Sequence, residues 1–290
     1  MDKQLKILKP MKYWWLYFII SLTVIIPGTF SLLKWGLKPS IDFTGGTTIV
    51  WKVQSDENSL RHAAKESDIE IRSIHSKEDI WTISTPPLTK DNYQSYKSLV
   101  VGAEELSFDT VGPALGGELI KKTISAIFLA ATLILFYVAY RFKNIKFGVS
   151  AILAMLHDSL VLLGIFSLLG HFLGIEVDTL FVTALLTILS FSVHDTIVVY
   201  DRIRELKKKH GYLEFDDIVN RAVVETMGRS INNSLTIIFM LLAMYLLGGD
   251  TTKWFIFALL IGTVSGTYSS TFTAAPILIA WDKLSHRIKK

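Results

Sequence analysis

The residues best suited to chemistry are two aspartates that interrupt long apolar runs. Asp195 follows His194 within the run 182–200, and Asp158 follows His157 within an earlier run. A charged side chain at membrane depth costs about 2.5–3.5 kcal/mol on insertion scales, so such groups usually face a bundle interior or a water-filled path. A carboxylate there can take up a proton when it is desolvated and release it when a cation approaches. Asp195 is therefore the leading candidate for reversible proton binding.

The two histidine–aspartate pairs also raise the alternative of a metal site. Metal ligands on one helix are usually four residues apart or converge from several segments, whereas adjacent residues project about 100° apart. The pairs His157–Asp158 and His194–Asp195 could bind zinc only if their two helices brought them together. We therefore expect no metal site and interpret His157 and Asp158 as a helix-packing or relay pair. An intramembrane metal-dependent hydrolase is kept as the less favoured alternative.

Composition favours a polytopic membrane protein over a soluble enzyme. Half of the 290 residues are hydrophobic and the mean hydropathy is +0.41, which is too apolar for an ordinary soluble domain. The chain has no cysteine, so disulfides and thiolate chemistry are excluded. A formal charge of +4 does not indicate a nucleic-acid partner. No P-loop, GxSxG or HExxH motif is present, and we expect neither an enzyme nor a bound cofactor.

Six apolar runs predict six membrane helices. They cover residues 13–33, 123–140, 147–170, 180–200, 231–247 and 254–281. Basic clusters at Lys3–Lys12, Arg141–Lys146 and Lys283–Lys290 place both termini in the cytoplasm by the positive-inside rule. The loop 201–230 is predicted on the same side. Its apolar residues at helical spacing indicate a segment that lies on the interface or packs beneath the bundle.

A soluble domain is predicted between the first two spans. Residues 36–118 hold thirteen acids against eight lysines and arginines, with no run long enough to span. Strand and helix patterns alternate there in the order β-α-β-β-α-β, which is the ferredoxin-like pattern. The expected organisation is therefore a first span within 1–35, an extracytoplasmic α+β domain at 36–118 and five further spans within 119–290.

Three motifs resemble the SecD/SecF family of bacterial protein-export membrane proteins, a branch of the resistance-nodulation-division (RND) superfamily. The motifs are HDTIVVYDRIRE at His194–Glu205, IDFTGGT at Ile41–Thr47 and FDTVGPALGGELIKK at Phe108–Lys122. The resemblance implies half of a twelve-span RND bundle, in which two repeats pack around a pseudo-two-fold axis. A half of this kind requires a second half, so either the partner SecD or a homodimer is implied.

The resemblance also assigns residues. The run ETMGRSINNSLT, Glu225–Thr236, resembles the family segment that carries an arginine near the fourth-span aspartate, which implies Arg229 as the cation that pairs with Asp195. His194 departs from the family pattern, where many relatives carry asparagine, and a second titrating group there could shift the pH dependence. The remaining motif residues are interpreted as structural: Asp42, Gly45, Gly46, Gly112 and Arg202.

The function implied by the resemblance is that of the SecF branch of the family. Such a subunit works with SecD and the SecYEG channel in the bacterial inner membrane, and uses the proton motive force to assist the export of preproteins across the lipid bilayer. The energetics suffice, because one charge crossing 100 mV is worth about 2.3 kcal/mol. The alternative from another class is an RND-type transporter of small solutes, which should have a substrate-sized cavity lined from several spans.

Overall fold

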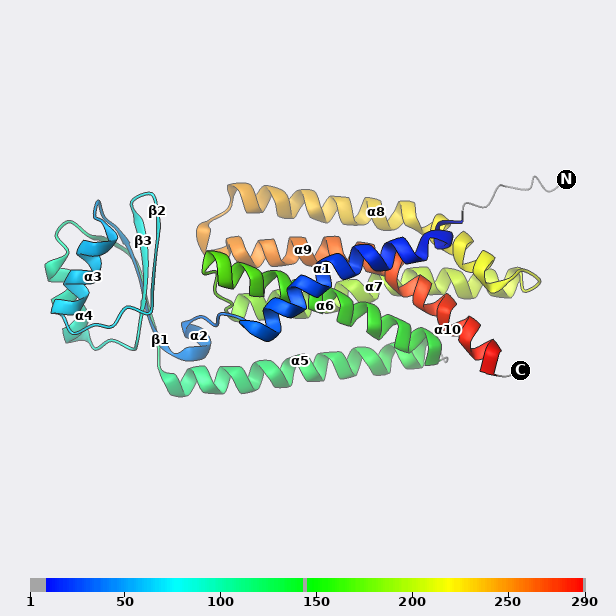
Figure 1. The fold of residues 1–290 in the computed structure, drawn as a ribbon, viewed down its shortest axis with the longest axis horizontal. Helices are drawn as coiled ribbons and strands as arrows, with labels where there is room; N and C mark the ends of the chain where they lie inside the picture. The colour runs from blue at the N-terminus through cyan, green and yellow to red at the C-terminus, as the bar shows by residue number, and fades with distance from the viewer. Residues whose placement is uncertain (1–8, 143–144, 289–290) are drawn as a thin grey trace. The chain divides into compact units, whose positions relative to one another are not determined.

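The computed structural model describes residues 9–142 and 145–288, which form two compact units (Figure 1). One unit comprises Pro39–Ala126 together with Glu176–Thr179, and the other comprises the rest of the described chain. Several basic residues that support the predicted topology, at positions 1–8, 143–144 and 289–290, lie outside the described residues.

Most of the larger unit consists of helices long enough to cross a membrane, and the prediction of six spans is confirmed. Within residues 9–142 and 145–288, six helical segments are long and apolar enough to span: Pro10–Lys34, Pro113–Phe142, Ile145–Leu173, Thr179–Lys209, Phe215–Leu247 and Lys253–Ser285. In order, these are η1 (Pro10–Tyr13) with α1 (Trp14–Lys34), α5, α6, α7, α8, and a last span made of α9 (Lys253–Ser269), η3 (Ser270–Ala274) and α10 (Ala275–Ile288). A short helix, η2 (Asp250–Thr252), precedes the last span.

The segment 201–230 is mostly helical, whereas the sequence predicted a loop. Helix α7 continues to Lys209 because pairs such as Glu205–Lys209, 2.7 Å apart, support its exposed end. Helix α8 already begins at Phe215, with two acids in its first turn where the helix dipole favours negative charge. Only residues 210–214 connect the two helices. The predicted apolar stripe packs into the core of the bundle, and its buried members are Ile218, Val219, Ala222 and Val223.

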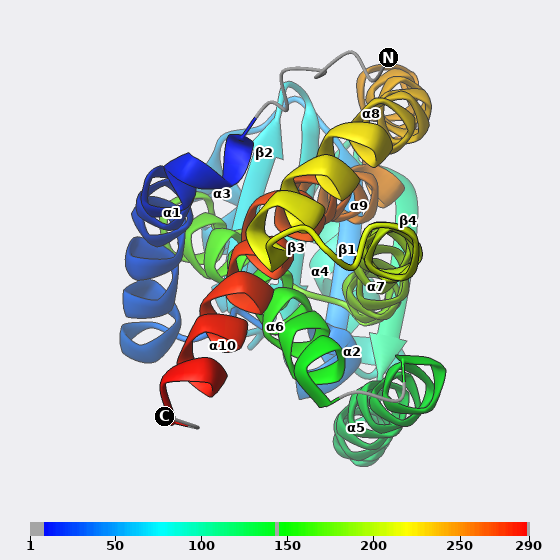
Figure 2. The same ribbon diagram turned by 90° about the vertical axis from the view of Figure 1, so that its right-hand side faces the viewer.

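Glycines allow close approaches between helices of the bundle. Figure 2 shows the bundle viewed from one end. A Cβ on Gly164 of α6 would lie 2.6 Å from the Cα of Gly28 on α1, so these two helices touch backbone to backbone. A Cβ on Gly262 of α9 would lie 2.2 Å from side-chain atoms of Ile188 on α7. Small residues at such crossings let the helix backbones approach closely, and the resulting van der Waals packing stabilises helix association in lipid.

The smaller unit contains one antiparallel sheet with the strand order β2-β3-β1-β4. Its elements are α2 (Ile41–Thr44), β1 (Gly46–Lys52), α3 (Glu57–Glu66), β2 (Ser73–Lys77), β3 (Ile80–Thr85), α4 (Lys90–Leu99) and β4 (Glu104–Val111). From β1 onward this is the predicted β-α-β-β-α-β order. Burial alternates along β1, and its inward residues Ile49 and Trp51 are both fully buried.

Two helices close the core of this sheet. Leu60 of α3 and Tyr96 of α4 are fully buried, and the Tyr96 hydroxyl donates to the Leu60 carbonyl over 3.1 Å. Burial raises the pKa of Tyr96 because it disfavours the phenolate. The side chain therefore stays neutral and supplies both apolar area and one satisfied donor, as buried tyrosines usually do.

The turn from α2 into β1 accounts for the paired glycines of the IDFTGGT motif. Gly45 has φ of +67° and Gly46 has φ of +148°, conformations that residues with a side chain rarely adopt. A Cβ on Gly46 would also lie 2.6 Å from the Thr85 carbonyl. The Gly112 position has open space instead, and a close approach occurs at Gly116, where a Cβ would lie 2.7 Å from the Phe43 carbonyl.

Asp42 of the same motif binds a segment distant in the sequence. Its Oδ2 accepts from the backbone N–H of Thr179 over 3.0 Å and from the Thr179 hydroxyl over 2.9 Å. Thr179 is the first residue of α7, where backbone N–H groups have no partner within the helix. The carboxylate satisfies one of these backbone donors.

Candidate functional site

Asp195 lies on α7 with its side chain turned into the bundle. Its exposed fraction is 4%, and its Oδ2 accepts a 2.7 Å hydrogen bond from the hydroxyl of Ser230 on α8. Within the described residues, Ser230 is its hydrogen-bond partner and no cation forms an ion pair with it. A buried carboxylate with one neutral donor is weakly compensated when it is ionised.

The structure does not bring the predicted Asp195–Arg229 pair together. Arg229 is exposed, while the next residue, Ser230, is buried and reaches the carboxylate. Consecutive residues on a helix project about 100° apart, so Arg229 lies on a neighbouring face of α8. His194 is also exposed, next to Asp195 on α7. The roles of Arg229 and His194 stay predictions.

Asp158 accepts hydrogen bonds from several side chains within the described part of the bundle. It is fully buried on α6, and its two oxygens accept four hydrogen bonds. Oδ1 accepts from Ser265 over 2.6 Å and from His157 Nδ1 over 3.0 Å. Oδ2 accepts from Ser192 over 2.5 Å and from Ser269 over 2.6 Å. Three of these donors come from α7 and α9, so the cluster ties α6 to both helices.

The cluster continues to the first span through His157. Its Nε2 lies 3.0 Å from the hydroxyl of Ser21 on α1, and Ser21 donates to the hydroxyl of Tyr268 over 3.5 Å. Tyr268 in turn donates to the Tyr17 carbonyl over 2.6 Å. A polar connection therefore runs across α1, α6, α7 and α9. The structure places His157 and Asp158 in this connection, which accords with a packing or relay pair.

The last span changes its hydrogen-bonding pattern directly after Ser269. Residues Ser270–Ala274 form a single π-helical turn, η3, before the chain resumes as α10. Pro276 follows within two residues, and a proline removes one backbone donor from a helix. π-helical turns of this kind recur at functional sites. The π-helical turn thus lies between α10 and the end of α9, where Ser265 and Ser269 donate hydrogen bonds to Asp158 of α6.

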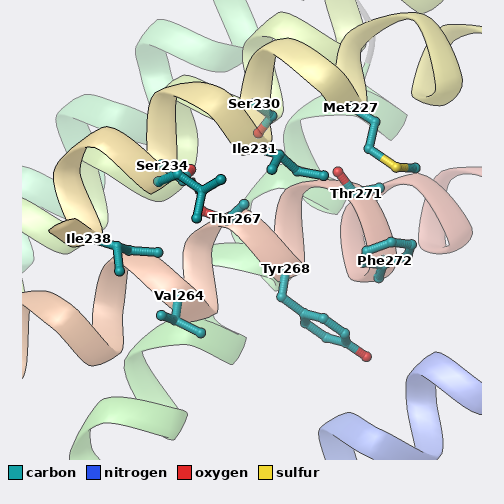
Figure 3. A pocket seen from close by; sticks show the side chains of 11 residues that line it. Met227, Ser230, Ile231, Ser234, Ile238, Val264, Thr267, Tyr268, Thr271 and Phe272 are labelled. Carbon is teal, nitrogen blue, oxygen red and sulfur yellow. Dashed lines mark hydrogen bonds between the residues drawn. The ribbon is translucent and has the colours of Figure 1, made fainter.

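A groove between α8 and the last span lies beside Ser230 (Figure 3). Its volume is about 270 Å³, and most of its walls are apolar. Its lining side chains include Met227, Ser230, Ile231 and Ser234 from α8, and Val264, Thr267, Tyr268, Thr271 and Phe272 from α9 and η3. The Thr267 hydroxyl donates to Ser234 across the groove over 2.6 Å. Ser230 thus both lines the groove and donates to Asp195.

Arg202, which the resemblance marks as structural, ties the ends of α7 and α8. Its Nε donates to Glu225 over 2.6 Å, and its guanidinium also pairs with Glu205. Both partners are carboxylates, so Arg202 is occupied by them and is not the cation beside Asp195. The described residues contain no group of three or more histidines and acids placed to hold a metal ion. The two histidine–aspartate pairs do not converge as the hydrolase alternative requires.

Four serines of the site were not predicted from the sequence. They are Ser192, Ser230, Ser265 and Ser269. A partial signal existed, because Ser265 and Ser269 are four residues apart in an apolar run and so share one helix face. Ser192 lies three residues before Asp195 on α7, which is also a same-face spacing. Which of these faces meets Asp158 depends on how the helices are rotated.

Comparisons with known proteins identify the family. The family described as "Protein export membrane protein SecD/SecF, C-terminal" matches residues 92–284. A protein translocase subunit SecF from Thermobaculum terrenum is 44% identical over 291 residues, covering 92% of this chain and 91% of that relative. A protein translocase subunit SecDF from Thermus thermophilus is 35% identical over 259 residues, covering 85% of this chain and 35% of that protein.

A solved structure agrees with these relatives. The crystal structure of SecDF from Thermus thermophilus, a translocon-associated membrane protein, matches with a TM-score of 0.87 and 32% identity. The match covers 98% of this chain and 40% of that chain, so this protein spans less than half the length of SecDF. The six spans and the inserted antiparallel sheet are thus those of a known membrane-protein fold. The chain belongs to the SecD/SecF family of protein-export membrane proteins.

Proposed function

We propose that this chain is the SecF-type subunit of a protein-export complex that, together with SecD, uses the proton motive force to assist preprotein movement through the SecYEG channel. Membership of the family supports the export role, and relatives that join SecD and SecF in one chain support the partnership. The single observation that carries the proton coupling is Asp195, a membrane carboxylate that is 4% exposed and has one neutral partner, Ser230.

In the proposed mechanism, Asp195 exchanges the proton and the helices around it respond. The hydrogen bond with Ser230 is enough to stabilise a neutral Asp195 in this buried position, whereas an ionised Asp195 requires a cation or water to offset its desolvation. Helix positions that supply such a partner are therefore favoured when the proton leaves. Protonation and helix arrangement become linked, and this linkage converts a gradient into movement.

Arg229 and His194 enter this mechanism as neighbours that could alter the proton affinity of Asp195. Arg229 lies one residue from Ser230 on α8, so a rotation of that helix by about 100° would exchange the hydroxyl for the guanidinium. His194 lies beside Asp195 on α7 and adds a second ionisable side chain next to the carboxylate. Arg229 is thus proposed as the cation of the second arrangement, and His194 as a modulator.

The groove beside the proposed proton site gives the small-solute transporter little support. The groove beside Ser230 has a volume of about 270 Å³ and is lined by α8 and the last span, so it is not a substrate-sized cavity enclosed by several spans.

Co-purification tests the proposed partnership. When the full chain is isolated in mild detergent from cells that contain the whole export machinery, we expect SecD to accompany it in stoichiometric amount and SecYEG to accompany it more weakly. An unrelated six-span protein expressed from the same promoter is the control. Recovery of a homodimer free of SecD would contradict the proposal.

The predicted orientation has its own test, because the chain lacks cysteine and single cysteines can report on each side. Ser76 on β2 and Ser285 on α10 are the proposed positions. With both termini in the cytoplasm, a membrane-impermeant thiol reagent should label Ser76→Cys in intact spheroplasts and Ser285→Cys only after the cells are opened. Labelling of both positions from the same side would contradict the six-span topology.

A further inference from the structure

A pocket of about 500 Å³ lies where α5 meets the end of α7, and three of its five lining residues are cationic. Arg141 comes from the last turn of α5, and Arg204 and Lys208 come from consecutive turns of α7. The other two lining residues are the aromatic Tyr140 and Phe142. None of the five carries a negative charge. The proposed proton site does not use this pocket.

The depth of the pocket follows from where the apolar part of each helix ends. Arg141 is the first charged residue after the apolar run of α5, and Asp201 opens the charged end of α7. Arg141 donates to Asp201 over 2.8 Å, so the two helices leave the apolar layer at the same level. Arg204 then lies about 4.5 Å further along α7 and the backbone of Lys208 about 10.5 Å further, at a rise of about 1.5 Å per residue. Side chains on a helix lean toward its N-terminus, so the Lys208 side chain leans back toward the apolar layer. The headgroup layer begins at the edge of the hydrocarbon core and is about 5–8 Å thick on each face.

The local charges leave a positive excess at that depth. Asp201 pairs with Arg141 and also lies 3.6 Å from the Arg204 guanidinium, so one carboxylate faces two arginines. Arg204 further donates to the Arg141 carbonyl over 3.3 Å, which holds its guanidinium beside the pocket. Lys208 has no ion pair within the described residues. Three cations against one acid leave a net charge of about +2 to attract an anion.

We propose that this pocket binds the phosphate headgroup of an anionic phospholipid. The charge attracts a phosphate, and the guanidinium and ammonium groups are donors suited to its oxygens. Tyr140 suits the same boundary, because it is 81% exposed and tyrosine is enriched where bilayer and water meet. Basic pockets between membrane helices are recognised headgroup sites. The acyl chains would lie along the exposed apolar face of α5.

Spin-labelled lipids test the proposal on the full chain in phosphatidylcholine nanodiscs. The motionally restricted fraction of spin-labelled phosphatidylglycerol, compared with that of spin-labelled phosphatidylcholine, gives the relative affinity for the anionic headgroup. Each basic residue near a membrane surface contributes about fivefold in affinity. We therefore expect the double variant Arg204→Gln/Lys208→Gln to lose most of the preference for phosphatidylglycerol.

Lys207→Gln is the matched control. Lys207 neighbours Lys208 on the same helix, but its ammonium lies 5.4 Å from the ring centre of Phe215, away from the pocket. This variant should keep the lipid preference. Equal losses in the control and the double variant would overturn the proposal in favour of diffuse surface charge. Displacement of the lipid by millimolar inorganic phosphate would overturn the lipid assignment, and loss of co-purifying SecD with unchanged lipid selectivity would reassign the pocket to a protein contact.

Discussion

Replacing Asp158 with alanine should destabilise the membrane bundle by about 2–3 kcal/mol, because three interhelical hydrogen bonds worth about 0.6–1 kcal/mol each are lost together. The substitution removes the acceptor of four hydrogen bonds and leaves three serine hydroxyls and His157 Nδ1 without their partner. Some hydroxyls will turn back to helix carbonyls, which keeps the loss below the sum of four separate bonds. Denaturant unfolding of the purified chain, followed by tryptophan fluorescence, measures the change.

Two further variants distinguish the stability contributed by the hydrogen bonds to Asp158 from the effect of removing any buried hydroxyl. Ser192→Ala removes one of the four donors and should cost about 1 kcal/mol, as single interhelical hydrogen bonds in membranes do. Thr29→Val is the matched control, because the buried Thr29 hydroxyl has no hydrogen-bond partner among the described residues. Its removal should change stability by less than about 0.5 kcal/mol. Equal effects of Asp158→Ala and Thr29→Val would show that Asp158 does not hold the helices together.

The spans were predictable because an apolar run of about twenty residues has few alternatives to a membrane helix. The ends of the helices were not predictable, because a helix can continue beyond the point where it leaves the apolar layer of the bilayer. Hydropathy marks where α7 leaves the apolar layer, near Asp201, but the helix continues to Lys209 through charged residues that pair along its surface. The ferredoxin-like order was also predictable, since its strands alternate in hydrophobicity. The association of Glu176–Thr179 with that unit is a long-range contact that no local pattern encodes.

For the site, the residue types could be predicted from the sequence but the orientation of the helices could not. A sequence reveals that Asp158 and Asp195 stand within apolar runs, because that depends on residue type alone. It does not reveal which face of the next helix meets them. Arg229 and Ser230 are consecutive on α8, so the rotation of that helix decides which of the two side chains faces Asp195. In the structure, Ser230 faces the carboxylate. The serines around Asp158 were likewise overlooked, because serine is common in membrane helices and gains meaning only from its partner.

Asp195→Asn should abolish gradient-driven export while leaving assembly with SecD intact. Asparagine keeps nearly the volume of aspartate and can still bond with Ser230, but it cannot bind and release a proton. The bundle then stays in the arrangement that suits the neutral side chain. Asp195→Glu retains a titrating group and should retain part of the activity. Arg229→Ala should impair the gradient-driven component in a similar way, whereas His194→Asn should only shift its pH dependence.

The most direct measurement compares preprotein import into inverted membrane vesicles with and without an imposed proton gradient. Vesicles that carry Asp195→Asn at the wild-type level, with SecD present in the same ratio, should import at the gradient-free rate under both conditions. The wild-type chain should respond to the gradient in the same assay. If vesicles with Asp195→Asn responded to the gradient as fully as the wild type, Asp195 would be a structural residue and the proposed coupling would be wrong.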